Sequence, residues 1–311
     1  MRAIRIHEFG DPEVMRVEEL PEPQPVDEEL LVRIHAVGVN PVETYVRSGI
    51  YSRLPALPYT PGTDAAGVET SSGARVYVTG SLSGTYADYA LCHREQVFPL
   101  PTGVTFAQGA ALGTPYTTAF HALFQRANAQ PGETVLVHGA SGGVGIATMQ
   151  FAAAAGLSVV GSAGSDAGLA LVAGQGSVGV VDHRDPDHLA RAVELSGGRG
   201  FDVIVEMRAD LNLGRDLRAL APRGRVIVVG SRGSVEVTPR DLMNTDASVR
   251  GMLLDNATPE ELTEAQRAIA IGLRDGSLRP VVGRELPLTE APRGHHVVME
   301  RPSLGKVVLV V

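Results

Sequence analysis

A glycine-rich turn near the middle of the chain constrains its fold more than any other feature. The segment Thr134–Gly145 (TVLVHGASGGVG) joins a short run of β-branched and apolar residues to the helix-like stretch Ile146–Ala155. Gly139, Gly142 and Gly145 follow a G-x-x-G-x-x-G spacing. Glycine permits tight backbone geometry and lets the chain approach a pyrophosphate closely, and the helix that follows points free N–H groups at the anion. The turn predicts a dinucleotide phosphate site; the alternative is a turn that only lets strand and helix pack.

Alternating strand and helix patterns extend this turn into a larger domain. Helix-like segments separate most of a series of short apolar runs, and this alternation predicts a parallel sheet covered on both faces. Six such strands match a complete dinucleotide-binding sheet, so the predicted class is α/β and doubly wound. An amphipathic helix follows over Pro259–Leu273, because its apolar residues recur at intervals of three and four. The strands are expected at Thr134–His138, Ser158–Ala163, Val178–Asp182, Asp202–Glu206, Arg225–Gly230 and Val249–Leu254.

The N-terminal part of the chain has a different pattern. Its first 110 or so residues are β-rich, with short runs such as Leu30–Val39 and Arg75–Thr79 split by turns that contain Pro and Gly. A helix-like stretch at Thr117–Asn128 leads into the second domain. The C-terminal tail ends in a strand at Lys306–Val311, and we interpret this tail as rejoining the N-terminal domain. The expected domains are 1–116, completed by 279–311, and 117–278.

Composition narrows the class of protein and its partners. A chain of 311 residues should hold about two domains. The formal net charge of −8 and the lack of a basic stripe argue against nucleic acid as a partner, because such binding depends on clustered Lys and Arg. Cys92 is the only cysteine, which excludes an internal disulfide and a four-thiolate zinc site. We expect a cytoplasmic protein, since the chain shows neither a signal peptide nor a run of roughly 18 apolar residues.

Five passages together resemble one known family. They are Gly38–Arg53 (GVNPVETYVRSGIYSR), Leu57–Val68 (LPYTPGTDAAGV), Val135–Gly145 (VLVHGASGGVG), Gly224–Gly233 (GRVIVVGSRG) and Pro239–Gly251 (PRDLMNTDASVRG). The family is that of the zeta-crystallin-like NADPH:quinone oxidoreductases, within the medium-chain dehydrogenase/reductase superfamily. The resemblance covers almost the whole chain. It implies a GroES-like catalytic domain beside a Rossmann domain, an active cleft between them, and assembly as a homodimer or homotetramer.

The residues at the zinc-ligand positions of this superfamily argue against a metal. The resemblance places Asn40 where the alcohol dehydrogenases have a first cysteine ligand, and Thr63 and Asp64 where they have a His-Glu pair. Catalytic zinc needs three protein ligands and one open position. His295 and His296 are adjacent, but neighbours on a helix do not face the same way. We therefore expect no metal, and reduction of an electron-poor acceptor rather than oxidation of an alcohol.

The strand after the glycine turn bears on the choice of cofactor. In an NAD-preferring site, an acidic residue about 20 positions past the glycines binds the ribose 2′-OH. Here Ser162 occupies the end of that strand, so a 2′-phosphate is not obviously repelled, although no Lys or Arg lies between Arg126 and Arg184. NADPH is the expected cofactor; for His183 and Arg184 the alternative is a solvated polar turn. The side chains expected to meet the 2′-phosphate are Ser162, Ser165, His183 and Arg184.

Further cofactor contacts come from the turn and from the resemblance. The turn supplies Gly139, Ser141, Gly142, Gly143, Val144 and Gly145. The resemblance adds Tyr45, Gly164, Asn212, Val229, Gly230, Ser231, Arg232, Met252, Leu253 and Leu254. Loops at the carboxyl ends of such strands line the ligand crevice of this fold. The alternative for Asn212 is a helix N-cap, and for Met252–Leu254 it is strand core.

Four side chains form the expected acceptor site: Asn40, Tyr45, Tyr51 and Thr63. Asn40 can donate through its amide and the tyrosines through their phenols, either to a carbonyl oxygen that gains charge or to frame the nicotinamide. The alternatives are a turn-former before Pro41 for Asn40 and half-buried packing for the tyrosines. The predicted function is zinc-independent, NADPH-dependent reduction of quinones. An enone or alkenal double-bond reductase, and an RNA-binding or structural crystallin-like protein, stay open as alternatives.

Overall fold

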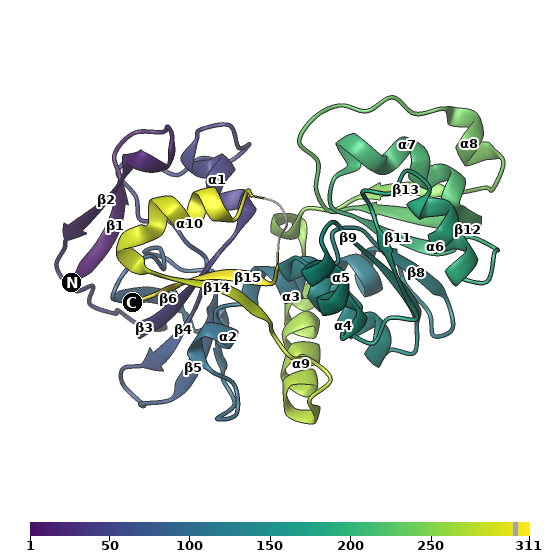
Figure 1. The fold of residues 1–311 in the computed structure, drawn as a ribbon. Coiled ribbons are helices and arrows are strands. Elements are labelled where there is room, and N and C mark those ends of the chain that lie inside the picture. Colours follow the sequence, from purple (N-terminus) through teal and green to yellow (C-terminus); the bar gives the residue numbers. More distant parts are fainter. Residues whose placement is uncertain (301–303) are drawn as a thin grey trace. The chain divides into compact units, whose positions relative to one another are not determined.

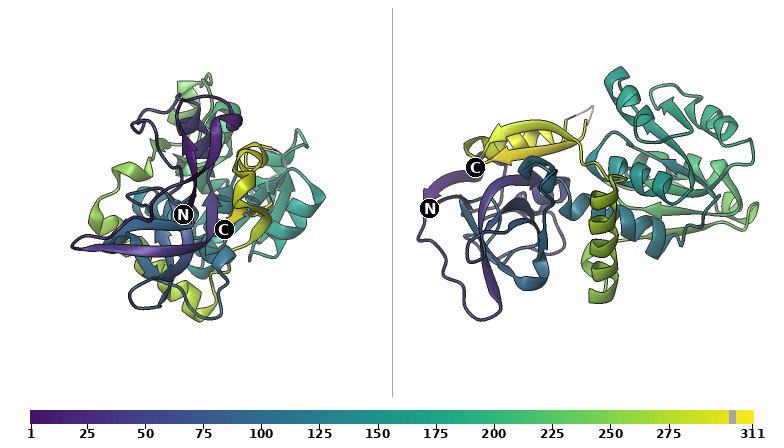
Figure 2. Two further views of the ribbon diagram at one scale, coloured as in Figure 1. Left: turned by 90° about the vertical axis from the view of Figure 1, so that its left-hand side faces the viewer. Right: turned by 90° about the horizontal axis from the view of Figure 1, so that it is seen from below.

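The chain folds into two compact units with different architectures. A computed structural model describes residues 1–300 and 304–311. Unit 1 contains Met1–Thr114, residues 280–300 and Gly305–Val311, and unit 2 contains Pro115–Arg279. In Figure 1 and Figure 2, unit 1 combines the purple and blue start of the chain with its yellow end, whereas unit 2 is mainly teal and green.

Unit 1 is built on a mostly antiparallel sheet. The sheet order is β14-β15-β3-β4-β5-β7, with β6 paired to β3, while β1 and β2 form a separate two-stranded sheet. Strand β15 runs antiparallel to β3, with Val307 opposite Val39, so the C-terminal tail belongs to the same sheet as the N-terminal strands. The strands are β1 (Arg2–Ile6), β2 (Met15–Glu19), β3 (Glu29–Val39), β4 (Asp64–Glu69), β5 (Arg75–Thr79), β6 (Tyr89–His93), β7 (Val97–Pro99), β14 (Val282–Pro287) and β15 (Lys306–Val310).

Short helices complete unit 1. Asn40 is the N-cap residue of α1 and Pro41 occupies its first turn, where the missing proline N–H has no helical partner to lose. The helices are α1 (Pro41–Arg47), α2 (Phe106–Gly109) and α10 (Ala291–Val297), with 3-10 turns at Pro12–Val14, Arg94–Gln96 and Leu288–Glu290. The core of unit 1 includes Ile4, Ile6, Val32, Ile34, Val37 and Leu309.

Unit 2 is a six-stranded parallel sheet in the order β10-β9-β8-β11-β12-β13. Figure 1 shows α4 and α5 on one face of this sheet and α6 and α7 on the other. The doubly wound class is thereby confirmed. Its strands are β8 (Thr134–Val137), β9 (Ser158–Ala163), β10 (Gly179–Asp182), β11 (Phe201–Glu206), β12 (Leu220–Val228) and β13 (Ser248–Gly251). Its helices are α3 (Gly113–Phe120), which begins at the end of unit 1, α4 (Gly143–Ala154), α5 (Asp166–Ala173), α6 (His188–Leu195), α7 (Ala209–Ala219), α8 (Pro239–Met243) and α9 (Pro259–Asp275).

Some element bounds differ from those predicted. The sixth strand ends at Gly251 rather than Leu254: the N–H of Met252 still meets the Val228 carbonyl at 3.1 Å, but a 3-10 turn then takes over at Leu254–Asn256. The expectation that Met252–Leu254 form strand backbone is therefore wrong. Helix α3 starts before the expected Thr117 and widens into a π-helical stretch at His121–Arg126.

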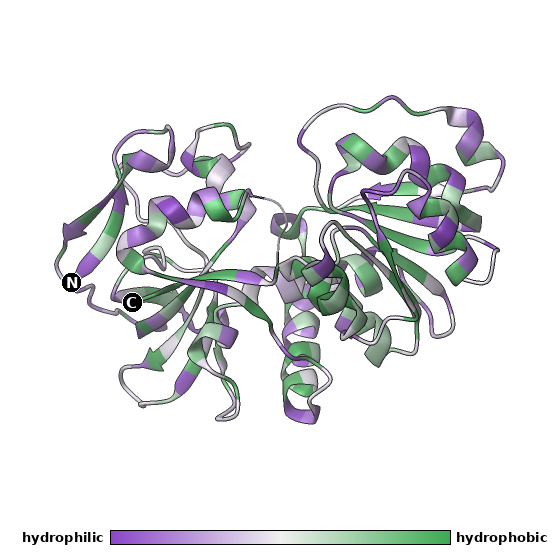
Figure 3. Ribbon diagram, viewed as in Figure 1, coloured by the Kyte–Doolittle hydropathy of each residue, from purple (hydrophilic) through white to green (hydrophobic). Residues whose placement is uncertain are grey.

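Hydropathy follows this architecture. The strands of unit 2 are largely green in Figure 3, as expected for a parallel sheet buried on both faces. Helix α9 alternates green and purple along its length, in keeping with Ile269 in the interior and Ile271 largely exposed. Among the described residues, no helix combines the length and the apolar character that crossing a membrane would demand.

Candidate functional site

The glycine turn of unit 2 has the geometry that a phosphate site requires. Gly139 adopts a φ of +59°, in the left-handed region that favours glycine. A Cβ on Gly145 would lie 2.4 Å from the carbonyl oxygen of Gly139, so no larger residue fits there without a shift. Gly142 is the N-cap residue of α4. The first N–H groups of that twelve-residue helix have no helical partners and are available to an anion.

The end of β9 departs from the predicted side-chain contacts. Ser162 is fully buried, and its Oγ lies 3.3 Å from Nδ1 of His138. Its hydroxyl therefore does not fit a direct contact with a 2′-phosphate. Ser165 caps α5 by accepting the N–H of Gly168 at 3.1 Å. Gly164 lies against the ring of His183, because a Cβ there would come within 2.2 Å of Nε2.

Two carboxylates hold Arg184 on the surface of this edge. Its guanidinium donates to Asp182 at 2.6–2.9 Å and to Asp166 at 3.2 Å. The hydrogen bonds from Arg184 lower the pKa of Asp182 to about 2. Asp182 is thus ionised at neutral pH, and the guanidinium of Arg184 already has two carboxyl partners. The structure brings Arg184 to the predicted edge, but with acidic partners that oppose an anion.

The loop after β12 is fixed to the end of β11. The N–H groups of Val229 and Gly230 meet the carbonyl oxygen of Glu206 at 2.9 and 3.2 Å. Asn212 lies in the first turn of α7, where its Nδ2 donates to Oε1 of Glu206 at 3.2 Å. The N-cap of α7 is Arg208, so the alternative role of Asn212 as a helix cap is wrong. Farther along the loop, the hydroxyl of Ser231 donates to the Gly233 carbonyl, and the N–H of Arg232 donates to Asp210.

A buried cluster of polar residues that sequence reasoning missed lies near the ends of β8 and β11. His138 follows β8, Glu206 ends β11 and Asp216 belongs to α7; we call these three residues the His138 triad. Nε2 of His138 is 2.9 Å from Oδ1 of Asp216 and 3.5 Å from Oε2 of Glu206. One polar atom from each residue lies within 4.8 Å of the other two. The separation of 2.9 Å is that of an ordinary N–H···O hydrogen bond, so His138 and Asp216 are hydrogen-bonded, whereas Glu206 lies beside them at ion-pair distance.

Charges in the His138 triad are set by burial and by mutual attraction. Burial opposes a charge on His138, but the carboxylates of Asp216 and Glu206 outweigh it and raise the pKa of the imidazole. Burial raises the pKa of Glu206 to about 7. Burial also disfavours the Asp216 carboxylate, yet its attraction to His138 lowers the pKa of Asp216. A histidine cation beside one carboxylate is the resulting state.

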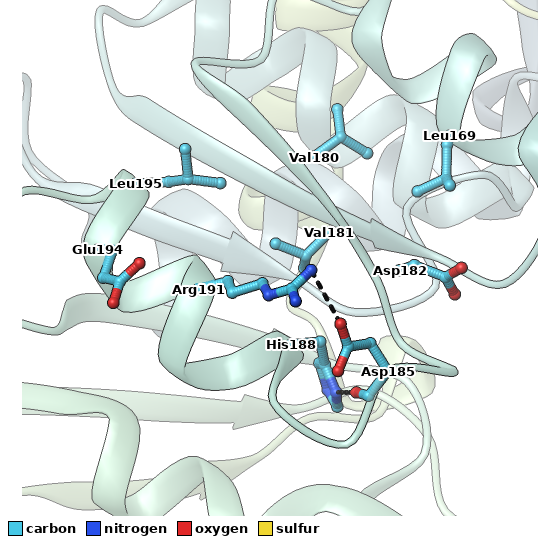
Figure 4. A pocket seen from close by; sticks show the side chains of 9 residues that line it. All are labelled: Leu169, Val180, Val181, Asp182, Asp185, His188, Arg191, Glu194 and Leu195. Atoms are coloured by element: carbon cyan, nitrogen blue, oxygen red, sulfur yellow. Dashed lines mark hydrogen bonds and ion pairs between the residues drawn. The ribbon is translucent and has the colours of Figure 1, made fainter.

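A cavity of about 610 Å³ adjoins the edge strand β10. Figure 4 shows Arg191 and His188 converging on Asp185, which the Arg191 guanidinium meets at 2.9 Å. Nδ1 of His188 donates to the Asp185 carbonyl at 2.6 Å, so its Nε2 carries a lone pair. None of the predicted site residues lines this cavity, whose walls are Leu169, Val180, Val181, Asp182, Asp185, His188, Arg191, Glu194 and Leu195.

Unit 1 holds a second buried polar cluster, around Asn40. Nδ2 of Asn40 donates to Oδ2 of Asp64 at 2.9 Å and to Glu43 at 3.4 Å, and Oδ1 of Asn40 accepts from the ammonium of Lys306. Lys306 also pairs with Asp64 at 3.1 Å. All of these side chains are at most 6% exposed. Because its donors and its acceptor are already occupied, Asn40 does not fit the predicted role of direct donor to an acceptor carbonyl.

The other oxygen of Asp64 connects this cluster to two threonines. Oδ1 of Asp64 accepts from the backbone N–H and the hydroxyl of Thr114, each at 2.8 Å. The exposed hydroxyl of Thr63 lies 3.4 Å from that of Thr114 and 3.5 Å from Asp64. We call Asn40, Asp64, Thr114 and Lys306 the Lys306 cluster. It links two predicted residues, Asn40 and Thr63, through an aspartate.

Glu43 extends the cluster into the core of unit 1. Its Oε2 accepts from the backbone N–H of Asn40 at 3.0 Å and from the phenol of Tyr86 at 2.7 Å. Burial raises the pKa of Glu43 to about 7. His295, one of the adjacent histidines, lies 3.2 Å from the phenol of Tyr86, and burial lowers its pKa to about 3. His296 points elsewhere, to Glu13 at 3.0 Å, as neighbours on a helix should.

The two predicted tyrosines lie on and just after helix α1. Tyr45 is half-buried within α1, and its phenol has no hydrogen-bond partner among residues 1–300 and 304–311. Tyr51 follows the helix and is also half-buried. The unused phenol of Tyr45 is the kind of donor that an external carbonyl oxygen requires.

Sequence reasoning also missed Lys306, although a signal was present. It is the only lysine among 27 basic residues, and it opens a strand that is otherwise apolar. A Cβ on Gly38 would come within 2.8 Å of Cε of Lys306, so this glycine makes room for the side chain. An ammonium is a compact point charge with three donors, which a planar guanidinium cannot replace in a tight space.

Family comparisons match both units. A family described as "Alcohol dehydrogenase GroES-like domain" matches residues 26–102, and one described as "Zinc-binding dehydrogenase" matches residues 143–270. The chain is 46% identical to the quinone oxidoreductase of Rattus norvegicus and 44% identical to that of Homo sapiens, across 100% of this chain and 98% of each relative. Among solved structures, the quinone oxidoreductase of Thermus thermophilus, determined also in complex with NADPH, superposes with a TM-score of 0.90 at 30% identity and full coverage of both chains.

The fold and the glycine turn define a medium-chain dehydrogenase/reductase with a GroES-like and a Rossmann domain. Within that class, the chain belongs to the quinone oxidoreductase family. The resemblance noted in the sequence is thereby confirmed. At the positions that the resemblance aligns with zinc ligands, this chain has the amide of Asn40, the hydroxyl of Thr63 and the carboxylate of Asp64, which pairs with Lys306.

Proposed function

We propose that this protein reduces quinones with NADPH and without zinc. The observation that carries the proposal is 46% identity, over the whole chain, to a quinone oxidoreductase. The local geometry supports it, since at the start of a helix Gly139 has a φ that favours glycine and Gly145 leaves no room for a side chain. Solved relatives named as NADPH complexes support the choice of cofactor.

NADPH would be held mainly by backbone groups. The N–H groups at the start of α4 would meet the pyrophosphate, with Ser141 close to that turn. Gly164, His183 and Arg184 would meet the adenosine ribose, and Arg184 must release an acidic partner to bind a 2′-phosphate. When bound, NADPH supplies two electrons as hydride. Further contacts are proposed at Tyr45, Asn212, Val229, Gly230, Ser231, Arg232, Met252, Leu253 and Leu254.

The acceptor would be positioned by groups of unit 1. Tyr45 and Tyr51 are the proposed donors to a quinone oxygen, and Thr63 offers an exposed hydroxyl as a third. Asn40 acts instead as a positioning residue, because it holds Asp64 and Asp64 holds the hydroxyl of Thr114. A quinone is electron-poor, so it needs no Lewis acid, and its reduced oxygen can take a proton from water.

We also propose that the protein is a cytoplasmic homodimer of zeta-crystallin type. Strand β13 lies at one end of the six-stranded sheet, and such an edge leaves backbone groups unpaired. Two copies of β13 paired about a two-fold axis would satisfy them. Light scattering at micromolar concentration tests this: a monomer contradicts it.

The test of the proposed reaction is a panel of acceptors. Purified protein is incubated with NADPH or NADH and with several quinones, enones or alkenals, and oxidation of the nicotinamide is followed by absorbance. We expect turnover of quinones, faster with NADPH. Brisk alkenal reduction without quinone turnover would assign the protein to the double-bond reductases. Loss of activity on chelation, with about one zinc per chain, would contradict the metal-free mechanism.

A further inference from the structure

The hydrogen bonds of the His138 triad leave part of its buried negative charge uncompensated. Oε2 of Glu206 and Oδ2 of Asp216 are buried and have no hydrogen-bond partner among the described residues. With His138 protonated and both acids ionised, the triad has a net charge of −1 in a site closed to water. Buried unpaired charges and acceptors are costly. One additional proton, shared between the two carboxyl groups, would supply the missing donor and bring the charge to zero.

Neighbouring groups do not supply that charge. Arg215, also on α7, is exposed and donates to Asn212 at 3.3 Å. The ring of His188 on α6 lies 6.5 Å from that of His138, and the charge of His138 also acts on His183 after β10. Burial lowers the pKa of both histidines, which disfavours a compensating charge on either. From β9, Ser162 offers a neutral hydroxyl to Nδ1 of His138. The proton must therefore reside within the triad.

Hydrogen bonds join the triad to the strand ends of unit 2 that carry the proposed cofactor contacts. Oε1 of Glu206 accepts from Asn212 and from the backbone N–H of Arg208, and its carbonyl oxygen accepts from Val229 and Gly230. On the other side, His138 immediately precedes Gly139 of the glycine turn. Ser162, which meets His138 through its hydroxyl, accepts the N–H of Ala140 through its carbonyl. A change in the triad is thus transmitted to β8, β9, β11 and the start of α7.

We propose that His138, Glu206 and Asp216 form a proton-holding triad that positions the dinucleotide edge of unit 2, so that cofactor affinity falls when the shared proton is lost. This inference rests on the proposed function for its ligand and on hydrogen-bond geometry for its mechanism. The step is a simple dissociation. The O–H bond of the Glu206 carboxyl breaks, the proton passes to water, and the freed carboxylate repels that of Asp216.

The direction of the pH effect follows from linkage. The pKa of Glu206 is raised from its ordinary value of 4.5 to about 7, so the folded state binds this proton more tightly than the unfolded state. The stabilisation is fully present below the unfolded pKa and is lost as pH rises through the folded pKa. The raised pKa of His138 acts in the same direction. The strand ends that contact the triad should therefore be best ordered at mildly acidic pH.

The experiment compares the native protein with E206Q. A glutamine amide donates permanently where the protonated acid donates, while its oxygen can still accept from Asn212. Affinities for NADPH and NADH are measured by fluorescence titration from pH 6 to 9. NADH is included because the 2′-phosphate of NADPH itself titrates, with a pKa of about 6 typical of phosphate esters. Amide hydrogen exchange of the ends of β8 and β11 is measured without ligand. Glu194→Gln, an exposed carboxyl on α6, is the matched control.

We expect the native protein to lose about tenfold in affinity for both dinucleotides across this range, or about 1.4 kcal/mol. E206Q should bind with little pH dependence, and the control should follow the native curve. Parallel pH curves for the native protein and E206Q would overturn the inference, as would a stoichiometric divalent ion bound by the triad. If no dinucleotide binds at any pH, the proposed function fails; pH-dependent exchange that E206Q abolishes would then still support the triad.

Discussion

Glu43 in unit 1 and Glu206 in unit 2 are two buried glutamates in opposite situations. Burial raises the pKa of each to about 7. The oxygens of Glu43 face donors only, from the backbone and amide of Asn40 and the phenol of Tyr86. One oxygen of Glu206 instead lacks a partner in the described structure and faces a second carboxyl group. The same rise in pKa therefore occurs in two different settings. The carboxyl group of Glu43 accepts hydrogen bonds, whereas that of Glu206 must donate one.

The clusters around these residues differ in the same way. The Lys306 cluster pairs an ammonium directly with a carboxylate, whereas the His138 triad contains Glu206, whose pKa is raised to about 7. We infer that the Lys306 cluster is a fixed ion pair and that the His138 triad is adjustable.

Removing the ammonium group of Lys306 should strongly destabilise unit 1. Lys306→Met leaves Asp64 buried and unpaired, and loss of one partner of such a pair costs about 3–5 kcal/mol of unfolding free energy. Urea denaturation at pH 7 measures this cost. The double variant with Asp64→Asn removes the stranded charge and should recover a large part of the loss. A single variant with native stability would show that Lys306 does not hold the cluster together.

Replacing each glutamate by glutamine tests the difference between Glu43 and Glu206 directly. Glu43→Gln puts an amide against donors and should cost about 1–3 kcal/mol, the range for a buried unsatisfied group. Glu206→Gln meets an acceptor, so its unfolding free energy at pH 7 should stay within about 1 kcal/mol of the native value. Denaturation at pH 6 and pH 8.5 measures both. Equal losses would mean that the two sites are equivalent after all.

The native protein should lose stability as pH rises from about 5 to 8. Both glutamates have raised pKa values, so the folded state holds protons that the unfolded state releases. The stabilisation is complete below a pH of about 4.5 and disappears as pH passes the folded pKa near 7. Glu206→Gln should flatten this profile in part. Thermal melts across the range provide the measurement, and stability that increases with pH would reverse the assigned signs.

Tyr45→Phe should lower kcat/KM for quinones about tenfold, on the scale of ~1.4 kcal/mol per factor of ten. The phenol has no partner within the described residues, so its loss removes a donor without stranding another group. NADPH affinity should change less, because most of the proposed cofactor contacts lie in unit 2. Steady-state kinetics with several quinones supply the numbers, and native rates with all of them would remove Tyr45 from the mechanism.

The smallest expected effect is at the ribose end of the cofactor site. Asp182→Asn frees Arg184 from a negative partner, so the preference for NADPH over NADH should rise a few-fold. The pair is exposed and screened by salt, which keeps the change modest. Asp187→Asn, an exposed carboxyl before α6, serves as the control. An unchanged ratio of the two affinities would show that Arg184 does not meet the 2′-phosphate.

Local patterns predicted the elements better than the contacts between them. The apolar, β-branched runs predicted the six strands of a doubly wound parallel sheet. The glycine spacing located a turn whose φ and close packing fit a phosphate site. The sixth strand was predicted too long because Met252–Leu254 is apolar although it leaves the sheet. Apolar character alone does not separate a strand end from the turn that follows it.

Side-chain partners were the part that sequence could not supply. Asn40 and Lys306 are 266 residues apart, and His138 and Asp216 are 78 apart, so no short-range pattern connects them. Ser162 was placed correctly at a strand end, yet its hydroxyl turns inward to His138. The composition did hold one clue, a lone lysine among arginines, whose meaning becomes clear only when its buried partners are seen.

That lone lysine also makes the protein unusually easy to observe. Apart from the α-amino group of the chain, Lys306 is the single primary amine, and only 4% of its surface is exposed. Reductive methylation with an isotopic label would therefore place one side-chain reporter in the chain, with no substitution needed. Its rate of modification would time the opening of unit 1, and its resonance would distinguish an ammonium held by Asp64 from one released to water.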